Sequence, residues 1–279
     1  MKIYISLDME GIAGTFTWTQ EENNRAEVRK CIMQQVEWVI EGIHQSEANK
    51  QIEEIVIADS HSSGDSLLYE TTAFDDRLHI ISGYPRPKYM MPAFDKSYDI
   101  VFFVGYHGGI GTVHSNMDHS YSPRFHRIWL QDKPMNESLI NAAYAGLFDV
   151  PVGLVIGDDA LFNQLKTSDA LPWVEYVTTK YSLSRFSVKC KPMNVVRIET
   201  IEAVKKTLNS DITGFLIYKF TPPVTLKIEL QTTSMADAVE MMPDVKRLDG
   251  FTIEYTHNDY SQIFDAIDAI ATLARSTKW

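Results

Sequence analysis

Cysteine is scarce in this chain of 279 residues, which contains only Cys31 and Cys190. Two thiols this far apart in the sequence provide neither a disulfide framework nor the thiolate set of a structural zinc site. Basic runs that could follow a phosphate backbone are also missing. The 26 Lys and Arg residues against 37 Asp and Glu give a formal net charge of -11. Nucleic acid is therefore not an expected partner.

Long apolar segments are absent as well. No stretch approaches the roughly 18 uninterrupted apolar residues that a membrane-spanning helix requires. The apolar run at the N-terminus is too short for a signal peptide, because Asp8 and Glu10 follow it at once. Together with the low cysteine content, these features predict an unanchored protein of the reducing cytoplasm.

Hydrophobic residues make up 44% of the chain, enough for a substantial core. Short apolar runs predict buried strands at residues 2–7, 52–58, 78–82, 99–106, 125–130 and 150–156. Apolar residues at helical spacing predict an amphipathic helix over residues 24–45, and a second helix is expected over 137–147. Strands that alternate with helices in this way predict an α/β fold with a mostly parallel sheet flanked by helices.

The pattern changes after about residue 168. Residues 224–230 alternate between apolar and polar, as in a half-exposed antiparallel strand. Residues 251–255 predict a further strand, and helices are expected over residues 200–208 and 261–275. We therefore predict a catalytic, metal-binding α/β domain over residues 1–167 and a smaller α+β domain over residues 168–279.

Polar side chains follow several of the predicted strands. Asp8 and Glu10 end the first strand at a spacing that puts both carboxylates on one side of an extended chain. Asp59 and His61 repeat this arrangement after the next strand. Asp8 and Glu10 alone are equally compatible with a cap or a turn, and Asp59 and His61 alone fit an N-cap with a solvent-exposed histidine better than a site. Ligand sites of parallel sheets, however, lie at the carboxyl ends of strands, where the two pairs can converge, and this convergence favours a site.

Histidines are concentrated in one segment. Four of the eight, His107, His114, His119 and His126, lie between residues 107 and 126, among several glycines. Imidazole is a common metal ligand and a natural acid or base near neutral pH. Oxygen and imidazole ligands without thiolate favour catalytic zinc, although manganese, cobalt or iron accept the same ligands. A pair of such metals is suited to hydrolysis.

Several ordered motifs that span most of the chain resemble the D-aminopeptidase family of self-compartmentalising zinc peptidases of dipeptide-permease operons. They are Ser6-Leu7-Asp8-Met9-Glu10-Gly11-Ile12, Asp59-Ser60-His61, Gly105-Tyr106-His107, Asp118-His119-Ser120, Glu137 with Asn141, Val150-Pro151-Val152 and Gly157-Asp158-Asp159.

The resemblance implies a site with two zinc ions per subunit. Asp8 would bridge them, with Glu10 and His61 completing one site and His107 and Glu137 completing the other. Asp59 would support the ligands from outside. His119 matches the family's catalytic histidine, as nucleophile or as general base for water.

The loop between His107 and His119 is about one residue longer than the family pattern and contains an extra histidine, His114, the second candidate for the catalytic residue. The basic residues Lys180, Arg185 and Lys189 follow the family's basic stretch in outline, as surface charges or as partners of a substrate carboxylate. The resemblance also implies short peptide substrates, a preference for D-amino acids and a homodecamer that encloses a chamber.

The leading interpretation is thus a zinc-dependent aminopeptidase. A dinuclear amidohydrolase or phosphoesterase acting on another small metabolite is the first alternative, and a non-catalytic metal-binding or peptide-binding protein of the same fold is the second. If the polar strand ends were only structural caps, the protein would bind no stoichiometric metal.

Overall fold

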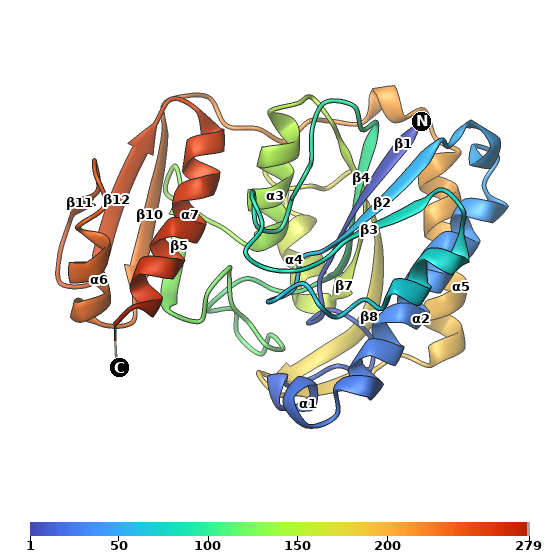
Figure 1. Cartoon of the computed structure of the whole chain (residues 1–279), viewed down its shortest axis with the longest axis horizontal. Helices are drawn as coiled ribbons and strands as arrows, with labels where there is room; N and C mark the ends of the chain where they lie inside the picture. The colour runs from blue at the N-terminus through green and yellow to red at the C-terminus, as the bar shows by residue number, and fades with distance from the viewer. Residues whose placement is uncertain (278–279) are drawn as a thin grey trace.

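The computed structural model describes residues 1–277, and its centre is a seven-stranded sheet (Figure 1). The strand order is β3-β2-β1-β4-β7-β8-β9, and every pair except β8 with β9 is parallel. The strands are β1 (Lys2–Leu7), β2 (Glu54–Asp59), β3 (Leu78–Ile81), β4 (Ile100–Tyr106), β7 (Val152–Asp158), β8 (Glu175–Ser184) and β9 (Ser187–Cys190).

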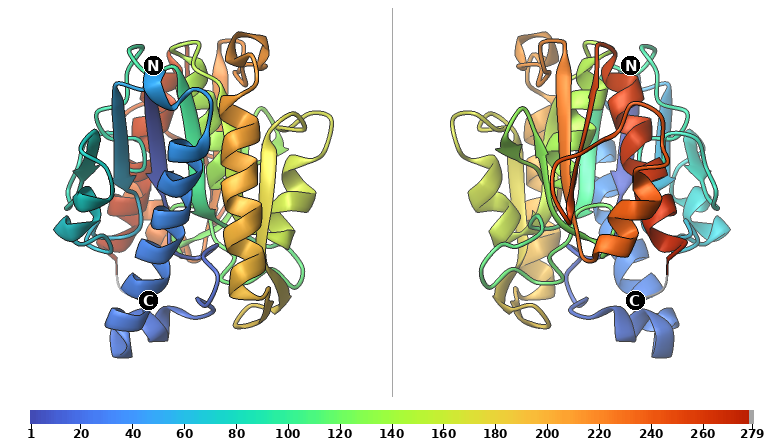
Figure 2. Two further views of the ribbon diagram at one scale, coloured as in Figure 1. Left: turned by 90° about the vertical axis from the view of Figure 1, so that its right-hand side faces the viewer. Right: turned by 90° about the vertical axis from the view of Figure 1, so that its left-hand side faces the viewer.

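Both faces of this sheet are covered, which explains why its central strands are continuous apolar runs. Ile3 and Ile5 of β1 pack with α2 (Arg25–Gln45) and α5 (Met193–Leu208) on one face. Tyr4 belongs to the core on the other face, which includes α3 (Glu137–Gly146). The helices α2 and α5 lie side by side over the sheet (Figure 2).

A second sheet of five strands stands beyond α3, with the order β11-β12-β10-β5-β6 and only antiparallel pairs. Helix α7 (Tyr260–Arg275) packs against β10, β12 and α3, so that it lies between the second sheet and α3 (Figure 1). The strands are β5 (Phe125–Leu130), β6 (Lys133–Pro134), β10 (Val224–Leu230), β11 (Lys246–Arg247) and β12 (Thr252–His257).

Shorter elements complete the described part of the chain. They are the helices α1 (Trp18–Asn23), α4 (Asp159–Leu165) and α6 (Thr233–Val239), and the 3-10 helices Asn49–Gln51, Tyr69–Phe74 and Ile212–Gly214. Within residues 1–277, no helix combines the length and the apolar character needed to cross a membrane.

The predicted fold class is confirmed, since a mostly parallel, helix-flanked sheet is joined to a smaller α+β unit. The division into domains at residues 167 and 168 stays a prediction, and it does not coincide with the division between the sheets. Strands β8 and β9 follow residue 168 but extend the first sheet, whereas β5 and β6 precede it but belong to the second. Sequence order misleads here because β5 pairs with the distant strand β10.

Glycines bring the ends of β1 and β4 unusually close together. The Gly11 amide donates a hydrogen bond to the Gly105 carbonyl at 2.6 Å. A Cβ atom on Gly105, whose φ is +79°, would lie 2.0 Å from the carbonyl oxygen of Asp8. Only glycine tolerates this combination of positive φ and close contact. The two chain segments that carry the candidate ligands are therefore in direct backbone contact.

Candidate metal centre

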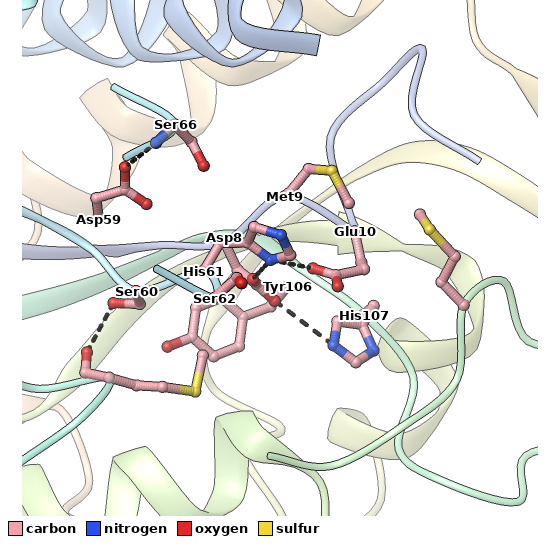
Figure 3. A network of polar contacts seen from close by, with 12 residues as sticks. Asp8, Met9, Glu10, Asp59, Ser60, His61, Ser62, Ser66, Tyr106 and His107 are labelled. Carbon is pink, nitrogen blue, oxygen red and sulfur yellow. Dashed lines mark hydrogen bonds and ion pairs between the residues drawn. The ribbon is translucent and has the colours of Figure 1, made fainter. Parts of the chain in front are cut away.

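Three adjacent strands end at the same edge of the first sheet, and each delivers a candidate ligand there. Asp8 and Glu10 follow β1, His61 follows β2 and His107 follows β4. Because β1 lies between β2 and β4, these side chains come from neighbouring positions and point toward one another (Figure 3). The segment after β4 also carries His119, and α3 begins with Glu137.

The first cluster consists of Asp8, Glu10 and His61, all buried. The His61 Nδ1 atom lies 3.3 Å from Asp8 Oδ1 and 3.1 Å from Glu10 Oε2. One imidazole nitrogen and two carboxylates thus face a common point, as in an oxygen- and nitrogen-liganded zinc or manganese site.

The second cluster consists of His107, His119 and Glu137. The Glu137 oxygens lie 3.4 Å from His107 Nε2 and 3.6 Å from His119 Nε2. The other carboxylate oxygen of Asp8, Oδ2, is 3.5 Å from His107 Nε2. Asp8 therefore faces both clusters, one through each oxygen, as expected of a bridging ligand.

Three atoms of the two clusters lack the hydrogen bonds that buried polar atoms usually make. Asp8 Oδ2, Glu10 Oε2 and His107 Nε2 are buried and accept or donate no hydrogen bond among residues 1–277. Buried polar atoms are nearly always hydrogen-bonded, and leaving them without a partner costs about 1–3 kcal/mol each. Metal ions between the two clusters would satisfy all three atoms, so the residues present fit a dinuclear centre.

Without metal, the centre must balance three buried carboxylates with protons. Burial and the neighbouring Glu10 charge raise the pKa of Asp8 to about 8. Burial lowers the pKa of His107, but the neighbouring Glu137 carboxylate outweighs it and raises that pKa to about 10. Protons on Asp8 and His107 thus take the place of metal charge, and metal binding must release them.

The ligands of the first cluster are held from outside by side chains of the short helix α1. The Trp18 Nε1–H donates to Glu10 Oε1 at 2.7 Å. The Glu21 carboxylate accepts a hydrogen bond from His61 Nε2 at 3.0 Å, on the opposite side of the ring from Asp8. This hydrogen bond lowers the pKa of Glu21.

Backbone groups hold the ligands of the second cluster. His107 Nδ1–H donates to the Gly108 carbonyl at 2.9 Å, and His119 Nδ1–H donates to the Met117 carbonyl at 3.0 Å. The Tyr121 amide donates to Glu137 Oε1 at 2.6 Å. In both histidines the Nε2 atom is therefore the one that faces the cluster.

Two charged residues near the centre have supporting positions. Lys180 of β8 is fully buried and donates to the backbone carbonyls of Glu10 and Thr15, so it fixes the loop after β1 and is not available to a substrate. Burial lowers its pKa to about 8. Asp59 accepts the amides of Ser66 and Leu67 at 2.6 and 2.8 Å and so holds the loop that follows His61.

A cavity of about 330 Å³ opens above the two clusters. His119 lines it and has a side chain that is 15% exposed, whereas that of His107 is 1% exposed. Arg275, at the end of α7, is the one lysine or arginine among the described residues that line this cavity. His114 is exposed and lines a separate hollow beside Asp159.

Comparisons with known proteins identify the family of the chain. The model of the D-aminopeptidase family, peptidase M55, matches residues 1–269. The chain belongs to the D-aminopeptidase family. The predicted activity of a metal-dependent aminopeptidase, a hydrolase, is thereby confirmed at the level of the family.

Two relatives cover the whole length of the chain. A D-aminopeptidase of Bacillus subtilis is 29% identical over 292 residues, with all of both chains aligned. A solved structure is similar with a TM-score of 0.92 at 26% identity, again over all of both chains. It is described as the Zn-dependent D-aminopeptidase DppA from Bacillus subtilis, a self-compartmentalizing protease.

The structure of this D-aminopeptidase family member brings together all six residues singled out from the sequence as ligands or catalyst. It leaves His114 and the exposed His126 outside the centre. The side chains that the sequence did not indicate are Trp18, Glu21 and Arg275. No local pattern identifies them, because their contacts with the centre come from chain segments without a recognisable motif.

Replacing one ligand of the second cluster should remove metal without unfolding the protein. In His107→Gln, we expect the bound metal per chain to fall by at least half, because Glu137 and Asp8 lose the shared imidazole nitrogen. Elemental analysis of the purified variant measures this. The matched control is His126→Gln, which changes an exposed histidine on β5 and should keep the wild-type metal content. Equal metal in both variants would contradict the ligand role of His107.

Proposed function

We propose that this chain is a dinuclear zinc aminopeptidase that releases N-terminal D-amino acids from short peptides. The observation that carries the proposal is the pair of three-residue clusters, joined by Asp8, in which buried ligand atoms have no hydrogen-bond partner. The zinc dependence and the D-substrate of the similar Bacillus subtilis protein support the choice of metal and substrate.

In this proposal, Asp8 would bridge the metals, Glu10 and His61 would complete one site, and His107 and Glu137 would complete the other. Zinc at such a centre lowers the pKa of water and polarises a carbonyl group. The protein fixes the orientation of the ligating imidazole rings through the hydrogen bonds of His61 and His107.

His119 is the proposed catalytic residue. Its Nδ1–H is tied to the Met117 carbonyl, so the lone pair of Nε2 faces the cavity between Glu10 and Glu137. From there Nε2 takes the proton of the attacking water and returns it to the leaving amine. Direct attack by Nε2 on the peptide carbonyl is the second role open to this atom.

Charge in the cavity also fits a short peptide. Glu21, which is not among the proposed metal ligands, lines the cavity and supplies a negative charge for the substrate's ammonium group, while the guanidinium of Arg275 on the same cavity complements a carboxylate. A zwitterionic dipeptide carries both groups. The cavity volume of about 330 Å³ is at the small end of ligand pockets, which favours small substrates.

The finer expectations of assembly and compartment belong to the same proposal. We infer a cytoplasmic homodecamer whose subunits enclose the active sites, as the resemblance implies. Exposed apolar side chains on and beside the β8–β9 hairpin, Leu183, Phe186 and Val113, support subunit contacts in this region. Native mass spectrometry tests the assembly: a particle of about ten chains is expected, and a monomer would contradict it.

The catalytic assignment is tested with D-Ala-D-Ala as substrate and L-Ala-L-Ala for comparison. We expect the wild type to cleave the D-peptide faster and to lose this activity after chelation. His119→Gln should retain its metal while kcat falls roughly 10²- to 10⁴-fold, the contribution of a positioned acid or base.

His114→Gln serves as the matched control, because it changes a histidine of the same loop that lies outside the cavity. It should keep nearly full activity. If His114→Gln lost activity and His119→Gln stayed active, His114 and not His119 would be the catalytic residue. A metal-loaded protein that cleaves neither peptide would favour the alternative of an amidohydrolase or phosphoesterase.

A further inference from the structure

The two clusters differ in the kind of group that holds their ligands from outside. Backbone groups fix the side chains of the second cluster: carbonyl groups accept from His107 and His119, and an amide donates to Glu137. Glu10 and His61, in contrast, are fixed by the side chains of Trp18 and Glu21. Glu10 and His61 therefore depend on one short helix. In the second cluster only His119 contacts that helix, through its ring against Trp18, and His107 and Glu137 are held without it.

The Glu21 contact has the geometry of a carboxylate–histidine–metal arrangement. The Nδ1 atom of His61 faces Asp8 and Glu10, and the Nε2 atom on the other side of the ring lies 3.0 Å from Glu21 Oε2. A carboxylate in this position selects the tautomer of the imidazole, fixes the ring plane and makes the ligating nitrogen more basic. Glu21 lies too far around the ring to bind the same metal.

Helix α1 itself is short and partly exposed, and its main anchor is Trp18, which packs against the apolar core, His119 and Phe186. The helix has six residues, none of them buried. The Glu21 side chain is 20% exposed, against 8% for His61 and 1% for Glu10. Its second partner is Arg25 at 3.7 Å, on the partly exposed start of α2. Short, exposed elements with few buried contacts open at low free-energy cost.

We propose that Glu21 is a positioning residue for His61, and that the metal held by Asp8, Glu10 and His61 is the weaker and more readily exchanged member of the pair. The inference rests on the proposed dinuclear function and adds an order of binding to it. The metal at His107 and Glu137 would bind first, to ligands already fixed by the folded backbone. The other metal would bind to Glu10 and His61, whose orientation depends on Trp18 and Glu21 of α1.

Stepwise zinc binding tests this inference without reference to activity. Metal-free protein is titrated with Zn²⁺ in competition with a chromophoric chelator, so that two binding constants are obtained. In Glu21→Gln the weaker constant should fall roughly 10- to 100-fold, the usual effect of removing such a partner, while the tighter one stays unchanged. Trp18→Phe, which keeps an aromatic ring but removes the N–H donor to Glu10, should weaken the same step.

Glu22→Gln is the matched control. Glu22 is the next residue of the same helix and is exposed. The substitution removes the same charge as Glu21→Gln, so both zinc-binding constants should remain those of the wild type. Equal losses in both steps of Glu21→Gln, or no loss in either, would overturn the positioning role. A wild type that binds no zinc at all would instead overturn the proposed function on which the inference rests.

Discussion

Three carboxylates, those of Asp8, Glu10 and Glu137, are buried at one edge of a parallel sheet, close to three histidines. Buried like charges repel one another and are costly unless cations join them. The histidines can supply that charge only by holding protons, and a metal pair supplies it without them. Much of the surrounding structure serves to keep these acids in place, from the Gly11–Gly105 contact to the buried Lys180.

Local patterns predicted the central architecture well because each central strand is buried on both faces. The apolar runs of β1, β2 and β4 are each followed by polar residues, so the sequence alone indicated Asp8, His61 and His107 as candidate ligands. The β8 strand gave no such signal. It is polar over much of its length, and its buried lysine would normally argue against a core position.

Long-range pairing set the other limits of prediction. Residues 125–130 read correctly as a strand, but nothing local tells that β5 leaves the first sheet and pairs with β10 almost a hundred residues later. Trp18 and Glu21 were missed for a similar reason, since a six-residue helix with no buried residue has no hydrophobic periodicity. The choice between His114 and His119 as catalyst rested on the resemblance alone, and only the cavity gives it a geometric basis.

The two clusters differ in the structural elements that hold their side chains in place. One half of the centre is fixed by the backbone of the folded domain, and the other by a helix at the mouth of the substrate cavity. Trp18 and Glu21 of α1 each contact a candidate ligand and line the cavity, so in the proposed function substrate and metal would meet at the same helix.

The most direct test of the dinuclear centre is the zinc stoichiometry of the folded protein. Metal-free protein is dialysed to equilibrium against a known, saturating concentration of free zinc. The zinc bound per chain is the difference between the zinc inside and outside the dialysis membrane, measured by elemental analysis, with protein concentration determined by amino-acid analysis. The proposed centre predicts about two zinc ions per chain. A value near one would contradict the bridging role of Asp8, and a value near zero would contradict the metal centre itself.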